Sequence, residues 1–128
     1  MLIVRDALLG VRRFEEFQAR LGIARNILTA RLEHLVDHGV FERVVYQQRP
    51  QRHEYQLTAK GRELWIVVAA MRQWGDRWAA PDGPPVQMIH TGCGEITTSV
   101  PTCANCAQPL HPADLQAIPG PGAAVPGS

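Results

Sequence analysis

The sequence predicts a mainly α-helical protein with one small β-hairpin, arranged as a winged helix-turn-helix and followed by a small hairpin-like appendage. Two helical patterns, at 14–22 and 24–38, are separated by a tight turn. Residues 41–58 then have the composition of two strands joined by a short basic tip. A winged helix places one helix in the major groove of DNA and its hairpin tip on the phosphates, so this order of elements also predicts a function.

The distribution of proline and glycine predicts the domain organisation. Nine of the ten prolines and six of the eleven glycines lie in residues 81–128, and 128 residues suffice for one ordinary domain with a small appendage. We therefore expect a DNA-binding domain at 1–80, a linker at 81–85, a zinc-binding hairpin at 86–112 and a disordered tail at 113–128.

Charge follows the same division. Residues 1–80 contain all thirteen Lys and Arg and nine acids, a balance of +4, whereas residues 81–128 contain three acids and no Lys or Arg. A basic excess on the helical part fits a nucleic-acid partner. No apolar run reaches the roughly 18 residues of a membrane span, and the start lacks the features of a signal peptide. These observations predict a cytoplasmic protein with no membrane partner.

The first helices follow from apolar spacing and from glycine stops. Residues 2–9 have helical character and end at Gly10, and a short extended piece at 12–14 is expected to add a third strand to the hairpin. The segment 14–22 repeats Phe14, Phe17 and Leu21 at helical spacing and ends at Gly22. It is the expected first helix of the helix-turn-helix.

The next helix, 24–38, is the expected recognition helix. Its core stripe is Leu28, Leu32, Leu35 and Val36. Its exposed N-terminal turn has Arg25, suited to guanine, Asn26, suited to adenine, and Thr29, which offers a hydroxyl or a methyl. We predict base contacts for these three residues and include the neighbouring Arg31 in the DNA-binding set.

The predicted wing follows directly. Strands are expected at 41–47 and 53–58, because both segments are rich in Val, Tyr, Phe and Thr. Arg49 and Arg52 bracket Pro50 in the tip between them, so two long cations are held away from the body of the domain. We predict that both contact DNA phosphates.

A long helix is expected from 59 to 80, capped by Thr58. Trp65, Ile66 and Trp74 lie outside its main apolar stripe and add more apolar surface than one small core needs. A second copy of the chain would cover this excess, which predicts a homodimer. The alternative is a helix buried on two sides by its own domain.

These segments together resemble the HxlR-type transcriptional regulators, relatives of the MarR group, over residues 2 to about 78. The most specific pieces are RRFEEF, LTARLEHL, GVFERVVY, RPQRHEYQLTAKG and the pair Trp74-Gly75. The resemblance implies a homodimeric winged-helix regulator that binds double-stranded operator DNA, in a family whose members often answer to small electrophiles or oxidants; the small-molecule effector of this chain is unknown.

Two departures from the family pattern are expected to matter. The chain begins at the end of the family's first helix, so a preceding segment with a cysteine is expected to be missing. Ala24 stands where the family commonly has an N-capping Ser, which weakens the recognition helix by about 1 kcal/mol.

The appendage contains two ligand pairs of equal spacing, His90 with Cys93 and Cys103 with Cys106. This pattern predicts a structural Zn²⁺ site of three thiolates and one imidazole. Alternatives are a CxxC thiol-disulfide pair and cysteines without a joint role, and His111 could replace His90.

No catalytic constellation accompanies these features, so an enzyme is not expected. Two other function classes stay open beside the DNA-binding regulator. One is a winged-helix protein-interaction module with a structural zinc hairpin, and the other is a CxxC redox protein.

Overall fold

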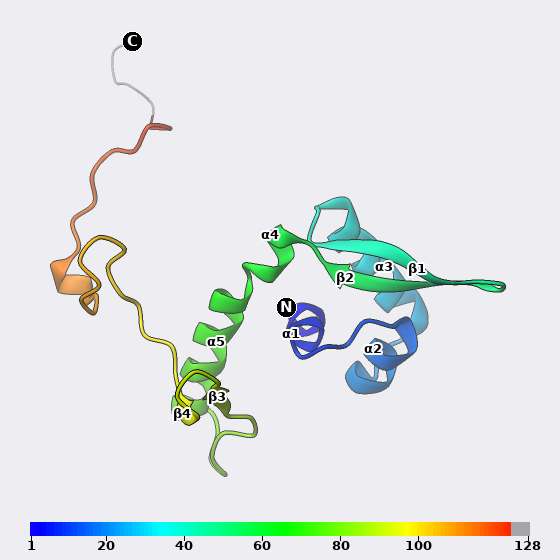
Figure 1. The fold of residues 1–128 in the computed structure, drawn as a ribbon, viewed down its shortest axis with the longest axis horizontal. Coiled ribbons are helices and arrows are strands. Elements are labelled where there is room, and N and C mark those ends of the chain that lie inside the picture. The colour runs from blue at the N-terminus through cyan, green and yellow to red at the C-terminus, as the bar shows by residue number, and fades with distance from the viewer. Residues whose placement is uncertain (124–128) are drawn as a thin grey trace.

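The computed structural model describes residues 1–123 and has the predicted order of helices and hairpin. Its helices are α1 (Leu2–Leu8), α2 (Phe14–Leu21), α3 (Arg25–Asp37), α4 (Ala59–Arg62), α5 (Trp65–Trp78) and the 3-10 turn η1 (Pro112–Asp114). Its strands are β1 (Phe41–Gln48), β2 (Gln51–Leu57), β3 (Met88–His90) and β4 (Glu95–Thr97). Figure 1 shows α1, α2 and α3 gathered beside the long β1–β2 hairpin, while α5 leaves this unit and leads to the appendage. The prediction of a winged helix-turn-helix is confirmed.

The hydrophobic core lies between α1, α2, α3 and the base of the hairpin. Its most deeply buried apolar side chains are Val4, Phe17, Leu28, Leu32 and Phe41. The ring of Phe17 meets that of Phe41 edge-on, with centroids 6.2 Å apart. The predicted stripe of α3 is confirmed, because Leu28 and Leu32 are fully buried and the other two members pack against this core.

The turn between α2 and α3 depends on one glycine. Gly22 ends α2 with φ +62, a left-handed conformation that disfavours side chains with a Cβ, and its amide donates to Gln18 O at 2.9 Å. Helix α3 starts three residues later, at Arg25. This short connection fixes the angle between α2 and α3.

The hairpin is a two-stranded antiparallel sheet with Arg49-Pro50 as its turn and an irregularity in register at Tyr46. The expected third strand at 12–14 is wrong for the described residues. Arg12 contributes a single bond, from Tyr55 N–H to its carbonyl at 2.7 Å. Pairing stops there because Arg13 is already the extended N-cap residue of α2.

The expectation of one helix over 59–80 is also wrong, because the chain breaks it into α4 and α5. Gly61 is buried so tightly that a Cβ there would lie 2.2 Å from the carbonyl oxygen of Val40. The Arg62 guanidinium donates to Leu57 O at 2.8 Å, and the Leu64 amide bonds back to Gly61 O at 3.1 Å, three residues earlier. Helix α4 is therefore attached to the hairpin, and a tight turn separates α4 from α5.

One charged side chain is buried in the helical unit. Asp6 of α1 is fully buried and lies 3.1 Å from Arg5 and 3.4 Å from Arg20 of α2. Both guanidiniums are about half exposed, so the buried carboxylate is paired with cations that stay in contact with solvent. This ion pair joins α1 to α2.

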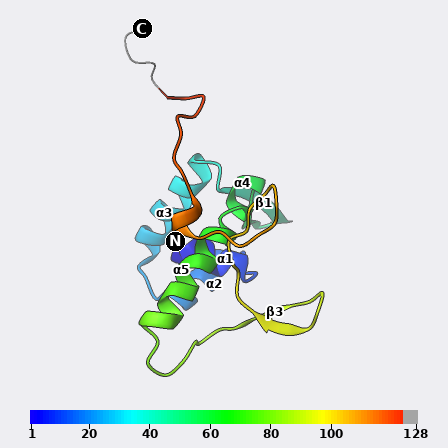
Figure 2. The same cartoon turned by 90° about the vertical axis from the view of Figure 1, so that its left-hand side faces the viewer.

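The appendage has hairpins but no core of its own. β3 and β4 pair antiparallel, and an isolated bridge joins Thr102 to Pro109. Between residues 81 and 123 no side chain is buried. Figure 2 shows the β3 hairpin standing out from the helical unit.

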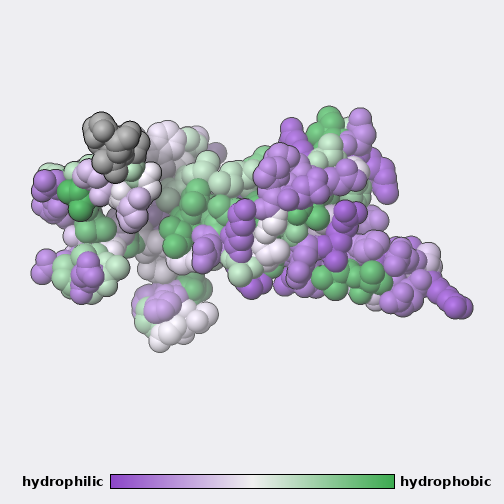
Figure 3. All heavy atoms as spheres, turned by 90° about the horizontal axis from the view of Figure 1, so that it is seen from above, coloured by the Kyte–Doolittle hydropathy of each residue, from purple (hydrophilic) through white to green (hydrophobic). Residues whose placement is uncertain are grey.

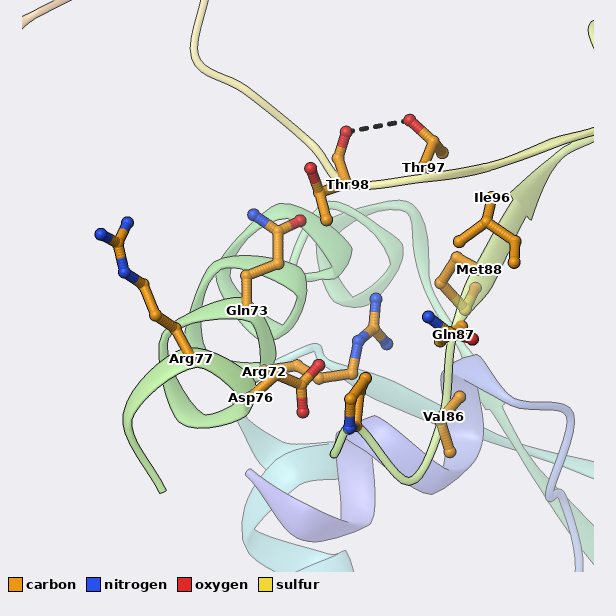
Figure 4. Close-up of a pocket in the computed structure, with 11 residues that line it drawn as sticks. Arg72, Gln73, Asp76, Arg77, Val86, Gln87, Met88, Ile96, Thr97 and Thr98 are labelled. Carbon is orange, nitrogen blue, oxygen red and sulfur yellow. Dashed lines mark hydrogen bonds between the residues drawn. The ribbon is translucent and has the colours of Figure 1, made fainter. Parts of the chain in front are cut away.

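The appendage and α5 line a hollow of about 270 Å³ (Figure 4). Arg72, Asp76 and Arg77 line the hollow from α5, and Met88 and Ile96 line it from the hairpin. Beside it the Gln73 side chain makes two hydrogen bonds to Ser99, at 2.9 and 2.6 Å.

The predicted disordered tail at 113–128 is described only in part. η1 covers its first two residues, and residues 124–128 lie outside the described range. Among the described helices, each is too short or too polar to cross a membrane.

Candidate nucleic-acid interface

The N-terminal turn of α3 and the wing face each other across a hollow of about 350 Å³. Arg25 and Thr29 line it from α3, and Arg52 and His53 line it from β2. The sequence separates these two pairs by more than twenty residues. The fold thus brings three of the predicted DNA-binding residues, Arg25, Thr29 and Arg52, to one face of the molecule.

Arg25 makes one side-chain contact and one backbone contact at the start of α3. Its guanidinium carbon lies 4.6 Å from the centre of the Phe14 ring, a cation-π stack with the first residue of α2. Its backbone carbonyl accepts the Thr29 hydroxyl at 2.9 Å. The Thr29 hydroxyl thus donates to the backbone and keeps its capacity to accept a hydrogen bond, while the stack on Phe14 does not use the hydrogen-bond donors of Arg25.

Asn26 lies beside these residues on the exposed face of α3. Arg25, Asn26, Thr29, Ala30 and Glu33 share this shallow surface. The anionic Glu33 lies two helical turns from the N-terminus and would be repelled by phosphates. The cation Arg25 therefore lies at the N-terminal end of this surface, and the anion Glu33 lies toward its other end.

The wing carries its cations at and near the tip. Arg49 and Arg52 are both exposed, and the Gln47 amide donates to Arg49 O at 3.1 Å, which bridges the turn. Below the tip, the Arg13 guanidinium stacks on Tyr46 at 4.2 Å and lies 3.7 Å from Glu54. The hairpin tip forms the hydrophilic right-hand end of the molecule in Figure 3.

Arg31 lies apart from this face. It is six residues beyond Arg25 on α3, a rotation that takes it round the helix from Arg25 and Thr29. Arg31 lines a separate hollow with Met1, Leu2 and Ile3 of the N-terminal helix and its cap. The structure therefore does not bring Arg31 together with the other predicted DNA-binding residues.

Sequence reasoning missed six further residues that line the hollow between α3 and the wing: Phe14, Glu15, Tyr46, Gln51, His53 and Tyr55. The polar residues Gln51 and His53 extend the wing side of this surface, whereas Glu15 adds an anion opposite the cations. Phe14 and Glu15 belong to α2 and the other four to the strands, so their position beside α3 depends on packing between elements, which spacing within one element does not show.

The predicted zinc ligands form two separate turns. Within residues 1–123 no three His, Cys, Asp or Glu side chains lie close enough together to hold a metal ion. The zinc hairpin is therefore not supported as an assembled unit. The N–H groups of Cys106 and then Asn105 lower the pKa of the Cys103 thiol, and the Asn105 amide lies 3.4 Å from its sulfur.

An apolar face is exposed along α5. Trp74 and Trp78 are each 67% exposed, Ile66 is 60% exposed and Trp65 is 50% exposed. Part of this face borders a second hollow between α5 and residues 99–102 of the appendage. The excess of apolar surface expected from the sequence is confirmed, and the described residues leave it open to a partner.

Comparisons with known proteins cover both parts of the chain. The HxlR-like helix-turn-helix family matches residues 1–83. An uncharacterized HTH-type transcriptional regulator of Mycobacterium tuberculosis is 42% identical over 123 residues, which is 95% of this chain and 78% of the relative. A match of that length must include most of the appendage.

Solved structures of similar proteins share this fold. The crystal structure of PA1607, provisionally named a transcription factor, superposes with a TM-score of 0.80 at 42% identity and covers 92% of this chain and 83% of its own. PA1374 from Pseudomonas aeruginosa, named in the same way, gives a TM-score of 0.70 at 40% identity over 96% and 84% of the two chains.

Proposed function

The chain belongs to the HxlR-like helix-turn-helix family of transcriptional regulators, and from this premise we propose how it binds operator DNA and how it dimerises. The N-terminal turn of α3 enters the major groove, and the wing lies on the adjoining backbone. Support comes above all from one observation, the common hollow lined by Arg25, Thr29 and Arg52. The comparisons do not favour the protein-interaction and redox alternatives.

The residues have different roles in this proposal. Arg25 and Asn26 read base edges, because a guanidinium pairs bidentately with guanine and a carboxamide with adenine. Thr29 contacts a base through its methyl or oxygen. Arg49 and Arg52 neutralise phosphates from the wing and so add affinity for any sequence.

We also propose that two copies pair through the exposed face of α5. Under two-fold symmetry the same face of each copy packs against that of the other. The tryptophans on α5 are large enough to provide a hydrophobic interface. A symmetric dimer would present two recognition helices to half-sites about one turn of DNA apart, near 34 Å. A small-molecule effector of unidentified chemistry belongs to the same proposal.

The DNA-binding proposal is tested by selecting duplexes from a random library and measuring affinity against salt concentration. Arg25→Ala should lose about 1–3 kcal/mol on the selected site and little on unrelated DNA. Arg52→Ala should weaken binding to every sequence and reduce the slope of log affinity against log salt by about one.

Arg31→Ala is the matched control, since it removes the same charge from α3 on a different side. It should change affinity less than Arg25→Ala does. Equal losses from the two variants on selected and unrelated DNA would mean that Arg25 contributes only charge, and the assignment of base reading to Arg25 would fail.

Dimer formation is tested by sedimentation of Trp65→Glu beside the unmodified chain. The variant should sediment as a monomer, and its binding to a paired site should weaken more than its binding to a half-site. A dimer that survives Trp65→Glu would place the interface elsewhere than on α5.

A further inference from the structure

The two ligand pairs of the appendage adopt the same backbone turn. Gly94 is the fifth residue counted from His90, has φ +75 and donates its amide to His90 O at 2.7 Å. Ala107 is the fifth residue counted from Cys103, has φ +62 and donates to Cys103 O at 2.8 Å. Each pair thus lies in a turn whose fifth residue has a left-handed φ. The amide of that fifth residue closes the turn by donating to the carbonyl of the first residue.

The left-handed conformation at Ala107 is informative because alanine adopts it at a cost of about 1–2 kcal/mol. The turn is held on both sides, since Cys103 N–H donates to Gln108 O at 2.8 Å and Thr102 pairs with Pro109. A second contact, from the Asn105 amide to Cys103 Sγ at 3.4 Å, directs a donor at the sulfur. Such a turn presents both cysteine side chains of a CxxC on one side, as a metal requires.

Nothing within residues 81–123 other than short hairpins organises this segment. Every side chain there is exposed except Cys103 and Leu110, which are half-buried, so no hydrophobic core stabilises the two turns. Segments of this size that lack a core are commonly stabilised by a metal or by disulfides. Three cysteines and one histidine in two x2 pairs match the donor set of a structural zinc site.

We propose that the appendage binds one Zn²⁺ within each chain, through His90 and Cys93 of the first turn and Cys103 and Cys106 of the second. This metal site is additional to the proposed DNA-binding function and does not depend on it.

In the structure the two turns stand apart, so binding the ion requires them to approach. Nine residues separate Cys93 from Cys103. This connection spans up to about 30 Å when extended, so it is long enough for the two turns to stand apart and short enough to keep them near each other. The Gln73 side chain holds Ser99 of this connection on α5. If this attachment persists, the change of conformation must occur between Ser99 and Cys103 or within the first hairpin.

The experiment measures zinc in the full-length chain, purified without chelator and then titrated with ZnCl₂. About one zinc per chain is expected, with the visible bands of a tetrahedral thiolate site when Co²⁺ replaces it. Cys93→Ser and Cys103→Ser should each reduce retained zinc to below about 0.2 per chain. Loss from both variants requires both turns to contribute.

Two controls test the ligand set. His111→Ala should retain the zinc, and Ala107→Gly should retain it while relieving the cost of the left-handed alanine. Retention by His90→Ala together with loss by His111→Ala would overturn the assignment of His90. Retention by Cys93→Ser would mean that the second turn alone holds the ion, and the proposal would fail.

A mixing experiment tests whether the site forms within one chain. Cys93→Ser chains are mixed with Cys103→Ser chains under conditions that exchange subunits. A site within one chain gives no recovery of zinc, whereas recovery would assign the site to two chains and overturn the proposal. Protein without zinc, whether Cys103 and Cys106 are joined in a disulfide or are free thiols, would also overturn it.

Discussion

Gly61 offers a sharp test of how the wing is attached to the domain. This glycine lies in α4, the short helix after β2, and a Cβ built on it would lie 2.2 Å from Val40 O and 2.9 Å from Leu57 Cδ2. The first of these neighbours is backbone at the start of β1, which cannot move without shifting the hairpin. Gly61→Ala is therefore a packing change at the junction between wing and helices.

Two opposing effects set the magnitude. Alanine is favoured over glycine inside a helix by about 0.5–1 kcal/mol. Overpacking a tight site costs about 1–3 kcal/mol, and a backbone neighbour places Gly61 in the upper part of that range. We expect a net loss near 2 kcal/mol, which for a domain of this size lowers the melting temperature by about 8–16 °C.

Gly75 provides the matched control, because within residues 1–123 nothing lies within 4 Å of a Cβ built there. Gly75→Ala should gain about 0.5–1 kcal/mol from helix propensity. Thermal unfolding of both variants is followed by circular dichroism at one protein concentration, since dimerisation would shift the midpoint. Should Gly61→Ala melt at or above the unmodified chain, the close approach of Gly61 to Val40 is not a constraint and the reasoning fails.

Substitutions at three further positions test local features by urea unfolding. Thr58→Ala should lose about 1 kcal/mol because the Thr58 hydroxyl accepts the Gly61 amide at 3.1 Å, while Thr58→Ser should lose less. Ala24→Ser should gain about 1 kcal/mol, because Ala24 is the extended N-cap residue of α3 and has no side-chain acceptor. An unchanged unfolding midpoint would show that the serine hydroxyl accepts no backbone amide of α3. Asp6→Asn should lose about 1–3 kcal/mol by removing the buried charge between Arg5 and Arg20, and a stability equal to the unmodified chain would mark that ion pair as dispensable.

The helices and the wing could be predicted because their signals are local. The stripe containing Leu28 and Leu32 repeats at the helical period, and the glycine at 22 stops a helix wherever the chain needs a left-handed residue. The same locality explains the errors. The break after α4 arises from the contact of Gly61 with Val40, which is distant in sequence and leaves no trace in the apolar pattern.

The site was predictable to the same degree. Arg25 and Arg52 follow from their positions at a helix start and a hairpin tip, and they line one hollow. The charge of Arg31 suits DNA, but its angle around α3 places it in a separate hollow. The Cys and His spacing predicted two tight turns, whose geometry the structure has, but spacing within each pair cannot determine whether the pairs meet.

The stack of Arg25 on Phe14 has a consequence for the rate at which DNA is released. A free arginine side chain loses up to about 2 kcal/mol of rotamer entropy when it is immobilised on a partner. The stack at 4.6 Å already restricts Arg25 in the free protein, so less of that entropy is lost on the operator. Phe14→Leu, which removes the ring and keeps an apolar residue, should therefore speed dissociation from the selected site while dissociation from unrelated DNA changes little.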